Sequence, residues 1–325
     1  MPTQPASTHP DRRPFGCILN PGANRNRATR NAEIVRTFLD AHFPGSRMFI
    51  SAGKGDISAL AMEISRSYGR ILICGGDGSI NETVQTAMYT GAEVGIIPMG
   101  SGNDFVKTPG ISRDVNIALK QLLGATCIRT DVLQYKAITE HGTSQGIVVN
   151  TLGLGFDGRA NAEATRMRSL KGPLMYAVAA LKAGFASRPV PAKITVAENG
   201  RQRSYEGSIL MLALANGRVE GGNFRICPEA DITDGLFNTV MVPEIGRLTL
   251  FTRLPLFLVG LQHLTQIVSY GTATQLHIQL ETPLPMHVDG EQIGNEIASL
   301  TAEIRPGALH LLVPAGFAKM HNPGH

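Results

Sequence analysis

Short apolar runs alternate with longer amphipathic stretches in the N-terminal part of the chain. The apolar runs lie at residues 15–19, 48–50, 71–74 and 94–97. Each is followed by a stretch in which apolar side chains recur every three or four positions, which is typical of an amphipathic helix. Alternating strands and helices need crossover connections, so the pattern predicts an α/β domain with a largely parallel sheet covered on both faces.

Strand-like runs dominate the chain beyond residue 132. They lie at residues 146–150, 194–197, 209–215, 236–242, 276–280 and 286–288. Glycine, proline and asparagine turns separate them, which predicts a second, mostly antiparallel domain. Two helical inserts are expected within this domain, at residues 173–185 and 245–264.

The length of 325 residues fits two domains better than one. We expect a flexible tail at 1–13, an α/β domain at 14–132, a β-rich domain at 133–313 and a second tail at 314–325. The C-terminal segment of the β-rich domain is expected to return to the first domain.

Polar turns that contain Gly, Asn, Ser or Asp follow each of the first four strands. They lie at residues 20–24, 51–56, 75–82 and 98–104. Ordinary loop chemistry also favours such residues. However, ligands of α/β sheets collect at the carboxyl ends of the strands. Four consecutive turns of this kind at one edge therefore favour a shared nucleotide site.

The third of these turns reads Gly-Gly-Asp-Gly-Ser-Ile-Asn-Glu at residues 75–82. Its glycines let backbone N–H groups approach an anion, and a helix that begins near Ser79 would add its own N–H groups and dipole. Ser79 and Glu82 also fit a capping box, which we expect in addition. Capping leaves the glycines, Asp77 and Asn81 unexplained, so phosphate binding is favoured. Because Asp77 would repel phosphate, it suggests a cation or an ordered water between them.

Two further groups of acids lie in the predicted β-rich domain. Asp231 and Asp234 are spaced so that both carboxylates can reach one hard cation with help from a carbonyl. An Asx turn before the strand at Leu236 explains the same residues without a metal, and both interpretations stay open. In Asp289-Gly290-Glu291, one carboxylate could act as a general base on a hydroxyl, although this short motif alone is weak evidence.

Composition narrows the class of protein. Hydrophobic residues at 43% and charged residues at 17% predict folded domains. A net charge of +4 and the absence of tryptophan argue against a nucleic-acid binder. Cys17 and Cys74 lie in apolar runs as reduced thiols would, and residues 1–13 lack a signal-peptide core, so we expect a cytoplasmic protein. No histidine has zinc-ligand spacing, and no zinc site is expected.

The insert at 245–264 is apolar, but Arg253 and Pro255 interrupt it, so we expect no transmembrane segment. It could line an acyl-chain pocket, lie at a membrane surface or pack as a buried helix. The basic residues Arg166, Arg168 and Lys171 could form a solvated face or a lipid-headgroup site.

These residues together resemble the catalytic domain of the diacylglycerol kinase and sphingosine kinase superfamily, specifically its soluble bacterial lipid kinases. The motifs that carry the resemblance are Asn20-Pro21, Lys54-Gly55-Asp56, Gly75 to Glu82, Gly100-Ser101 with Asn103-Asp104, Asn150 with Gly153 and Gly155-Phe156-Asp157, Gly221-Gly222, Pro228 with Asp234-Gly235, and Asp289-Gly290-Glu291. The resemblance runs from about Cys17 to the C-terminus, and the ordered set is far more specific than any one motif.

The resemblance implies ATP-dependent phosphorylation of a lipid hydroxyl such as that of diacylglycerol. It also implies a nucleotide domain, a β-sandwich-like domain for the lipid substrate and a site in the cleft between them. ATP contacts would fall on Asn20, Pro21, Gly22, Ala23, Asn24, Ser51, Gly75, Gly76, Asp77, Gly78, Ser79, Ile80, Asn81, Glu82 and Ser101, with Asp104. Glu291 would accept the proton with Asp289 beside it. Mg²⁺ would bind structurally at Asp231, Asp234 and the Leu236 carbonyl, and catalytic Mg²⁺ near Asp77 and Asp104.

The sequence departs from the family pattern at several positions. Serine stands at 51, 79 and 101 where threonine is usual, Asn24 replaces a glycine, and Gly158 stands where alanine is common. These changes affect fine nucleotide geometry and leave the proposed carboxylates intact.

Three functions stay open at this point. The first is a lipid kinase that contacts the membrane peripherally. The second is a kinase of a soluble substrate, such as NAD or a sugar phosphate, since those enzymes also use a Gly-Gly-Asp-Gly turn. The third is a non-catalytic nucleotide or lipid binder. The Asn81-Glu82 continuation and the Asp289 motif favour the first. The oligomeric state is open, with a homodimer as one alternative.

Overall fold

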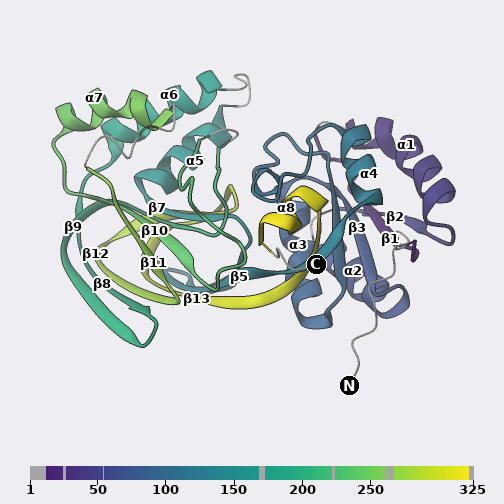
Figure 1. The fold of residues 1–325 in the computed structure, drawn as a ribbon. Helices are drawn as coiled ribbons and strands as arrows, with labels where there is room; N and C mark the ends of the chain where they lie inside the picture. The colour runs from purple at the N-terminus through teal and green to yellow at the C-terminus, as the bar shows by residue number, and fades with distance from the viewer. Residues whose placement is uncertain are drawn as a thin grey trace. The chain divides into compact units, whose positions relative to one another are not determined.

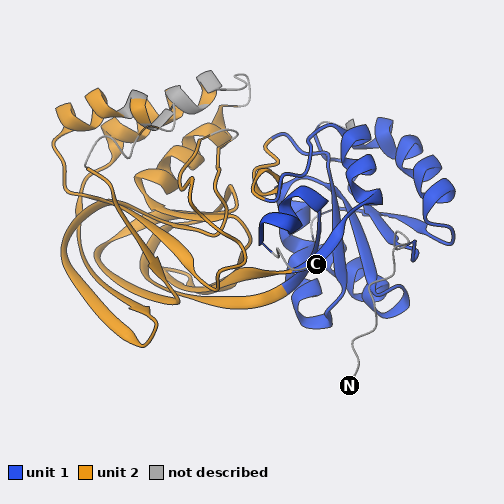
Figure 2. Ribbon diagram, in the orientation of Figure 1, with its two compact units in different colours: residues 1–101, 109–128, 309–325 blue, residues 102–108, 129–308 orange. Residues whose placement is uncertain are grey.

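The structure is a computed structural model that describes residues 12–24, 27–53, 55–167, 173–221, 224–258, 261 and 267–321. The chain forms two compact units (Figure 2). Unit 1 comprises residues 1–101, 109–128 and 309–325, and unit 2 comprises residues 102–108 and 129–308. The chain therefore leaves unit 1 and returns to it at the C-terminus.

Unit 1 contains a parallel sheet. Its strands are β1 (Gly16–Leu19), β2 (Arg47–Ile50), β3 (Arg70–Gly75), β4 (Glu93–Pro98) and the end of β13 (Glu291–Val313). They lie in the order β2-β1-β3-β4-β13, and each neighbouring pair is parallel (Figure 1). Every residue of β1 and β3 is buried, as expected for strands covered on both faces.

The helices of unit 1 are α1 (Arg27–His42), α2 (Asp56–Ser67), α3 (Asp77–Thr90), α4 (Val115–Leu123) and α8 (Ala315–His321). In α2 the buried side chains Ile57, Ala61 and Ile64 recur at helical spacing. Ile64 occupies the space beside Gly16 of β1 that a Cβ would need, so the glycine allows the helix to lie close to the sheet. Helix α8 lies within residues expected to be a tail.

Unit 2 contains mostly antiparallel strands. They are β5 (Thr126–Thr139), β6 (Gly142–Val148), β7 (Thr151–Gly155), β8 (Val190–Glu198), β9 (Arg201–Ala215), β10 (Phe237–Pro243), β11 (Ser269–Ala273), β12 (Gln275–Val288) and the larger part of β13. Their order is β11-β10-β9-β7-β12-β13, while β8 pairs with β9 and β12, and β5 with β6 and β13. Strand β12 runs antiparallel to β7, β8 and β13 in turn.

Two cores lie against β9 because its side chains divide between two faces. Leu212 and Leu214 belong to one core, and Leu210 and Ala213 to the other. The second core is covered by α5 (Phe156–Arg166), α6 (Pro173–Ala186) and α7 (Arg247–Leu258), as Figure 1 shows. A short 3₁₀ helix, η1 (Phe105–Lys107), also belongs to unit 2.

The two predicted helical inserts correspond to α6 and α7. Helix α7 ends at Leu258, and most of the remaining expected helix, at 259–260 and 262–264, lies outside the described residues. So do Lys54, Arg168, Lys171 and Gly222. Within the described part of the chain, no helix combines the length and apolar character needed to cross a membrane.

Candidate functional site

The glycine turn after β3 is tighter than its sequence predicts. Strand β3 ends at Gly75, Gly76 is extended, and α3 begins at Asp77, two residues before the predicted start. None of the three glycines has a positive φ. Gly76 is instead required for close approach, since a Cβ there would lie 3.0 Å from Gly100 Cα. The turn therefore uses glycine to bring two backbone segments together.

The predicted capping box of Ser79 and Glu82 is wrong. Helix α3 has no side-chain cap hydrogen bond. Ser79 Oγ accepts a hydrogen bond from Asn20 Nδ2 at 2.8 Å, and Glu82 Oε2 accepts one from Gly55 N–H at 3.0 Å. Both side chains thus connect α3 to neighbouring turns and do not cap its N-terminus.

Hydrogen bonds join the turns that follow β1, β3 and β4. Asn20 N–H donates to Cys74 O at 3.0 Å, and Met99 N–H donates to Gly75 O at 2.8 Å. Ser101 Oγ donates to Asn24 Oδ1 at 3.3 Å. Asn24 has a φ of 47°, a conformation that glycine and asparagine tolerate best, so asparagine fits where the resemblance implies a glycine.

Unit 1 therefore gathers most of the predicted nucleotide contacts at the carboxyl ends of its strands. Ser51 follows β2, and its buried Oγ has no hydrogen-bond partner in the part of the chain that the structure describes. Ile80 is buried, while Asn81 Oδ1 accepts from Gln85 Nε2 at 2.7 Å on the helix surface. Arg113, which the sequence did not single out, donates from Nη2 to Ser101 O at 3.1 Å. It adds a cation to an edge where the expected ligand is an anion.

The remaining predicted residues lie in unit 2. They are Asp104, Asp231, Asp234, Leu236, Asp289 and Glu291. Asp104 Oδ1 forms an ion pair with Lys107 Nζ at 2.7 Å, and both side chains are largely buried. The ion pair therefore fixes the orientation of the Asp104 carboxylate within the single turn of η1.

The Asp289 side chain binds backbone N–H groups. Its carboxylate accepts hydrogen bonds from the N–H groups of Val149, Asn150 and Thr151, at 3.0, 2.8 and 3.0 Å. Its φ of 49° and the φ of 83° at Gly290 form the tight turn between β12 and β13. Asp289 thus fixes the chain that leads into β7, while Glu291 is exposed at the start of β13.

A side chain of α5 also holds the turn that carries Glu291, and Tyr135 lies near this turn. Asn161 Nδ2 donates to Gly290 O at 3.0 Å. Burial raises the pKa of Tyr135, and the negative charges of Asp289 and Glu291 raise it further, against a hydrogen bond with Ser144 that lowers it. Tyr135 is therefore a neighbour of these acids that the sequence pattern did not reveal.

Asp231 and Asp234 are joined by a third carboxylate that was not predicted. Asp131, in β5, accepts hydrogen bonds from the N–H groups of Gly235 and Gly307, both at 2.7 Å. Burial raises the pKa of Asp131 and of Asp234, and the charge of Asp231 raises both further. The three acids therefore repel one another, which a bound cation would relieve.

The Asx-turn interpretation of these residues also has support. Asp231 Oδ1 accepts from the N–H and hydroxyl of Thr233, at 2.9 and 2.7 Å. Asp234 Oδ1 accepts from Leu236 N–H at 2.9 Å. Turn formation and cation binding are compatible because each carboxylate has a second oxygen.

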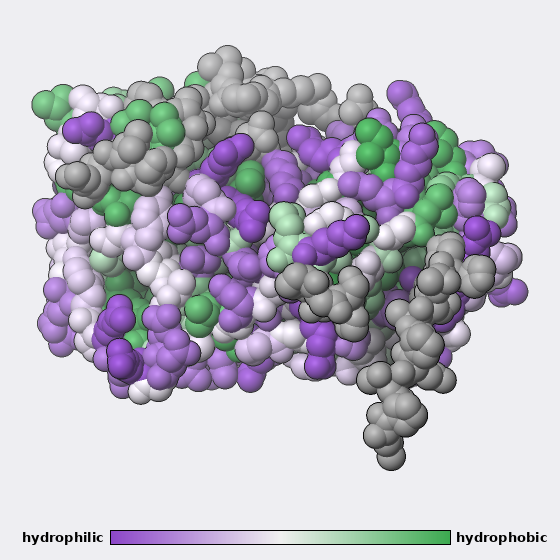
Figure 3. All heavy atoms as spheres, viewed as in Figure 1, coloured by the Kyte–Doolittle hydropathy of each residue, from purple (hydrophilic) through white to green (hydrophobic). Residues whose placement is uncertain are grey.

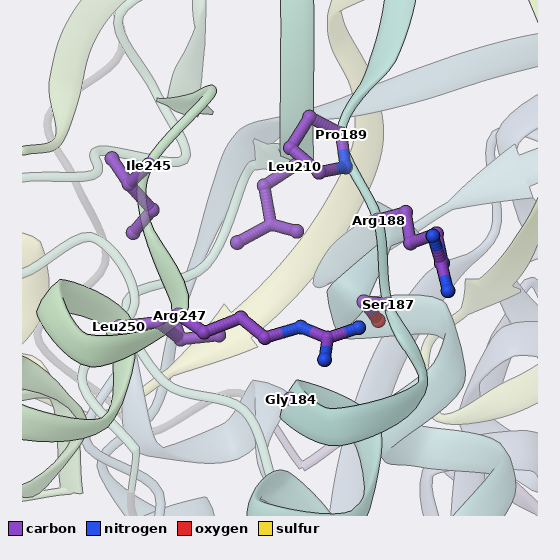
Figure 4. A pocket seen from close by; sticks show the side chains of 8 residues that line it. All are labelled: Gly184, Ser187, Arg188, Pro189, Leu210, Ile245, Arg247 and Leu250. Carbon is purple, nitrogen blue, oxygen red and sulfur yellow. The ribbon is translucent and has the colours of Figure 1, made fainter.

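A pocket of about 490 Å³ opens between α6, α7 and β9 (Figure 4). Its lining residues are Gly184, Ser187, Arg188, Pro189, Leu210, Ile245, Arg247 and Leu250. Leu210 points into it, and the guanidinium of Arg247 extends toward Ser187 (Figure 4). The Ser187 hydroxyl is buried, and no described residue forms a hydrogen bond with it. Apolar walls beside two arginines suit an anionic amphiphile.

The sequence matches two family descriptions. Residues 14–135 match "Diacylglycerol kinase catalytic domain", and residues 150–313 match "YegS C-terminal NAD kinase beta sandwich-like domain". The chain is 27% identical over 265 residues to the Stenotrophomonas maltophilia protein named "Probable lipid kinase YegS-like", covering 79% of this chain and 82% of that one. It is 26% identical over 258 residues to the Mycobacterium tuberculosis protein named "Diacylglycerol kinase", covering 78% and 80%.

A solved structure shares the fold. It is a diacylglycerol kinase from Bacillus anthracis, with a TM-score of 0.71, 20% sequence identity, and coverage of 94% of this chain and 98% of that one. Both family matches lie in the order that the resemblance predicts, which confirms the lipid kinase assignment. The chain belongs to the diacylglycerol kinase-like lipid kinase family, with a diacylglycerol kinase catalytic domain followed by a YegS C-terminal domain.

Proposed function

We propose that the protein uses ATP and Mg²⁺ to phosphorylate the hydroxyl of diacylglycerol or a related lipid at the cytoplasmic membrane surface. The observation that carries the proposal is the connected edge of unit 1. There, hydrogen bonds from Asn20 and Met99 hold the turns after β1, β3 and β4 together beside the N-terminus of α3. Backbone donors and a helix dipole at one edge are suited to a triphosphate.

The nucleotide would be bound mainly by backbone and neutral side chains. Amides and hydroxyls for the nucleotide would come from residues 20–24, residues 75–82, Ser51 and Ser101. Arg113, which donates a hydrogen bond to Ser101 O, would add a positive charge. This supports ATP binding because phosphoryl transfer depends mostly on positioning and charge neutralisation.

Mg²⁺ has donor sets that fit it. A hard cation prefers oxygen ligands, and one set would consist of Asp231, Asp234 and the Leu236 carbonyl. Asp131 lies beside this set and adds a third carboxylate. Asp77, at the start of α3 in unit 1, would hold Mg²⁺ at the nucleotide. When bound there, Mg²⁺ would neutralise phosphate charge.

Glu291 is proposed as the group that accepts the proton of the lipid hydroxyl. Asp289 is proposed as its positioning residue, because its three backbone hydrogen bonds fix the turn on which Glu291 lies. The exposed position of Glu291 leaves it accessible to a substrate hydroxyl.

Helices α6 and α7 are proposed to contact the membrane. Phe185 and Leu248 are 66% and 80% exposed, and hydrophobic residues gather over α7 (Figure 3). Arg188 and Arg247 are exposed beside them at the pocket. Apolar side chains flanked by cations favour an interface with anionic lipids.

The test is phosphate transfer from radiolabelled ATP to diacylglycerol in phospholipid vesicles, with Mg²⁺. We expect Glu291→Gln and Asp77→Ala to lower kcat by about 10²- to 10⁴-fold, the usual contribution of proton transfer or electrostatic stabilisation. Glu206→Gln, an exposed change in β9, is the matched control and should leave kcat unchanged.

Acceptor choice decides between the remaining functions. Transfer to NAD or fructose 6-phosphate and not to diacylglycerol would overturn the lipid assignment. Binding of ATP and vesicles with no transfer to any acceptor would retire the enzyme. Full activity of Glu291→Gln would remove the proton-acceptor role from that residue.

A further inference from the structure

Three titratable side chains from separate segments of unit 2 converge at one buried point. Asp157 lies in the first turn of α5, Glu220 in a short bridge after β9, and His287 in β12. One donor atom from each lies within 4.8 Å of the other two. His287 Nε2 lies 3.3 Å from Asp157 Oδ2. The proposed kinase mechanism uses none of these three groups.

Two of the three groups are deeply buried and have polar atoms that lack hydrogen-bond partners among the described residues. Glu220 is 7% exposed and His287 is 3% exposed. Glu220 Oε2 and His287 Nδ1 are buried and have no hydrogen-bond partner among the described residues. Burial raises the pKa of Glu220 well above its usual range, and the charge of Asp157 raises it further, against a hydrogen bond with Thr151 that lowers it. A buried carboxylate of this kind needs a proton or a cation.

Two glycines keep the space around these groups clear. Gly153 of β7 is paired in register with His287, and a Cβ there would overlap both the Asp157 carboxylate and the His287 ring. A Cβ on Gly158 would overlap the backbone carbonyl of Pro285, so this glycine lets α5 lie close to β12. The backbone therefore brings the three donors together without filling the space beside them.

We propose that Asp157, Glu220 and His287 bind a divalent transition-metal ion such as Zn²⁺ or Mn²⁺. An imidazole nitrogen with two carboxylates suits these ions, whereas Mg²⁺ and Ca²⁺ prefer oxygen ligands alone. Ligands at about 2.1 Å from an ion lie roughly 3–4.2 Å apart, and the 3.3 Å between His287 Nε2 and Asp157 Oδ2 falls within this range. Three protein ligands leave a coordination position for water or a substrate oxygen. This site is separate from the oxygen-only set at Asp131, Asp231 and Asp234.

The experiment measures metal content in the full-length protein. Chelator-treated protein is dialysed against Zn²⁺ or Mn²⁺ with excess Mg²⁺ present, and bound metal is counted by elemental analysis. Wild type should retain one transition-metal ion more than Glu220→Gln or His287→Asn. The apparent affinity of each variant should fall at least about 10- to 100-fold, the range known for mutations of a site's outer partners. Glu206→Gln and His141→Asn change exposed side chains and should match wild type.

A second measurement needs no variant, since either substitution could also unfold the protein. Co²⁺ bound to wild type should show the visible absorption of a protein-ligated ion, and Zn²⁺ should abolish it. Equal metal content in wild type and the folded variants would place the ion elsewhere and overturn the proposal. So would wild type that binds no ion, or that gives the spectrum of aqueous Co²⁺. In those cases the two carboxyls and the imidazole would share protons instead.

Discussion

The two units differ in how they present charge. The candidate residues of unit 1 are mostly backbone amides, hydroxyls and carboxamides arranged around the start of α3. Those of unit 2 are carboxylates that are buried or held close together, such as Asp131, Asp234 and Glu220. One unit is thus suited to receive an anion and the other to receive cations or protons. We expect the function of unit 1 to suffer most from substitutions that add side-chain atoms, and the stability of unit 2 from substitutions that remove carboxylates.

The largest expected effect tests the unit 2 side of this contrast. Asp289→Ala removes an acceptor of three backbone hydrogen bonds. Bonds to a charged acceptor contribute about 1.5–3 kcal/mol each and are not additive, so we expect the free energy of unfolding to fall by roughly 3 kcal/mol or more. Urea denaturation measures this change. A loss of less than about 1 kcal/mol would mean that the turn is held by other contacts.

A single added methyl group tests unit 1. In Gly76→Ala the new Cβ would lie 3.0 Å from Gly100 Cα, so the two turns must separate. We expect ATP affinity to weaken by about 10- to 100-fold, or 1.4–2.7 kcal/mol, in equilibrium binding. Gly124→Ala is the matched control, because among the described residues no atom beyond its two chain neighbours lies within 4 Å of its Cβ position. Equal ATP affinity in both variants would contradict the close-approach role of Gly76.

Cation binding by the three acids is expected to give a smaller, concentration-dependent effect. Millimolar Mg²⁺ should raise the Tm of wild type by a few degrees, because a ligand specific for the folded state stabilises it. Each kcal/mol added to the free energy of unfolding raises Tm by about 2–4 °C for a domain of this size. Asp234→Asn should abolish the shift without changing the response to ATP. A shift that persists in Asp234→Asn would mean that Mg²⁺ binds elsewhere.

The smallest expected effect comes from an acid in unit 1 that caps a helix. Asp114 Oδ1 accepts from Ile117 N–H at 3.0 Å at the start of α4. Asp114→Ala should lower the free energy of unfolding by about 1 kcal/mol, as loss of an N-cap usually does. ATP affinity should not change. A larger loss of stability than in Asp289→Ala would reverse the contrast between the two units.

Local patterns predicted the elements well and their connections poorly. Runs such as residues 71–74 became buried strands, and the inserts became α6 and α7, because burial and periodicity are properties of a short window. The capping box failed because Asn20 and Gly55, distant in sequence, compete for Ser79 and Glu82. A spacing rule cannot include such partners.

The acids show the same limit. The pattern identified Asp231 and Asp234, but Asp131 joins them from β5, where it looks like an ordinary strand residue. Likewise, residue spacing does not reveal that His287 lies beside Asp157 and Glu220, because the three come from distant elements. Sites built from several segments of unit 2 become visible only when strand order is known.

Strand β13 has a consequence for how the protein is made. Its first part pairs with β12 in unit 2, and its end pairs in parallel with β4 through His310 and Leu311. The N-terminal sheet therefore lacks an edge strand until His310 and Leu311 have left the ribosome. The first unit to be synthesised is completed last, and until then β4 presents an open edge to other nascent chains.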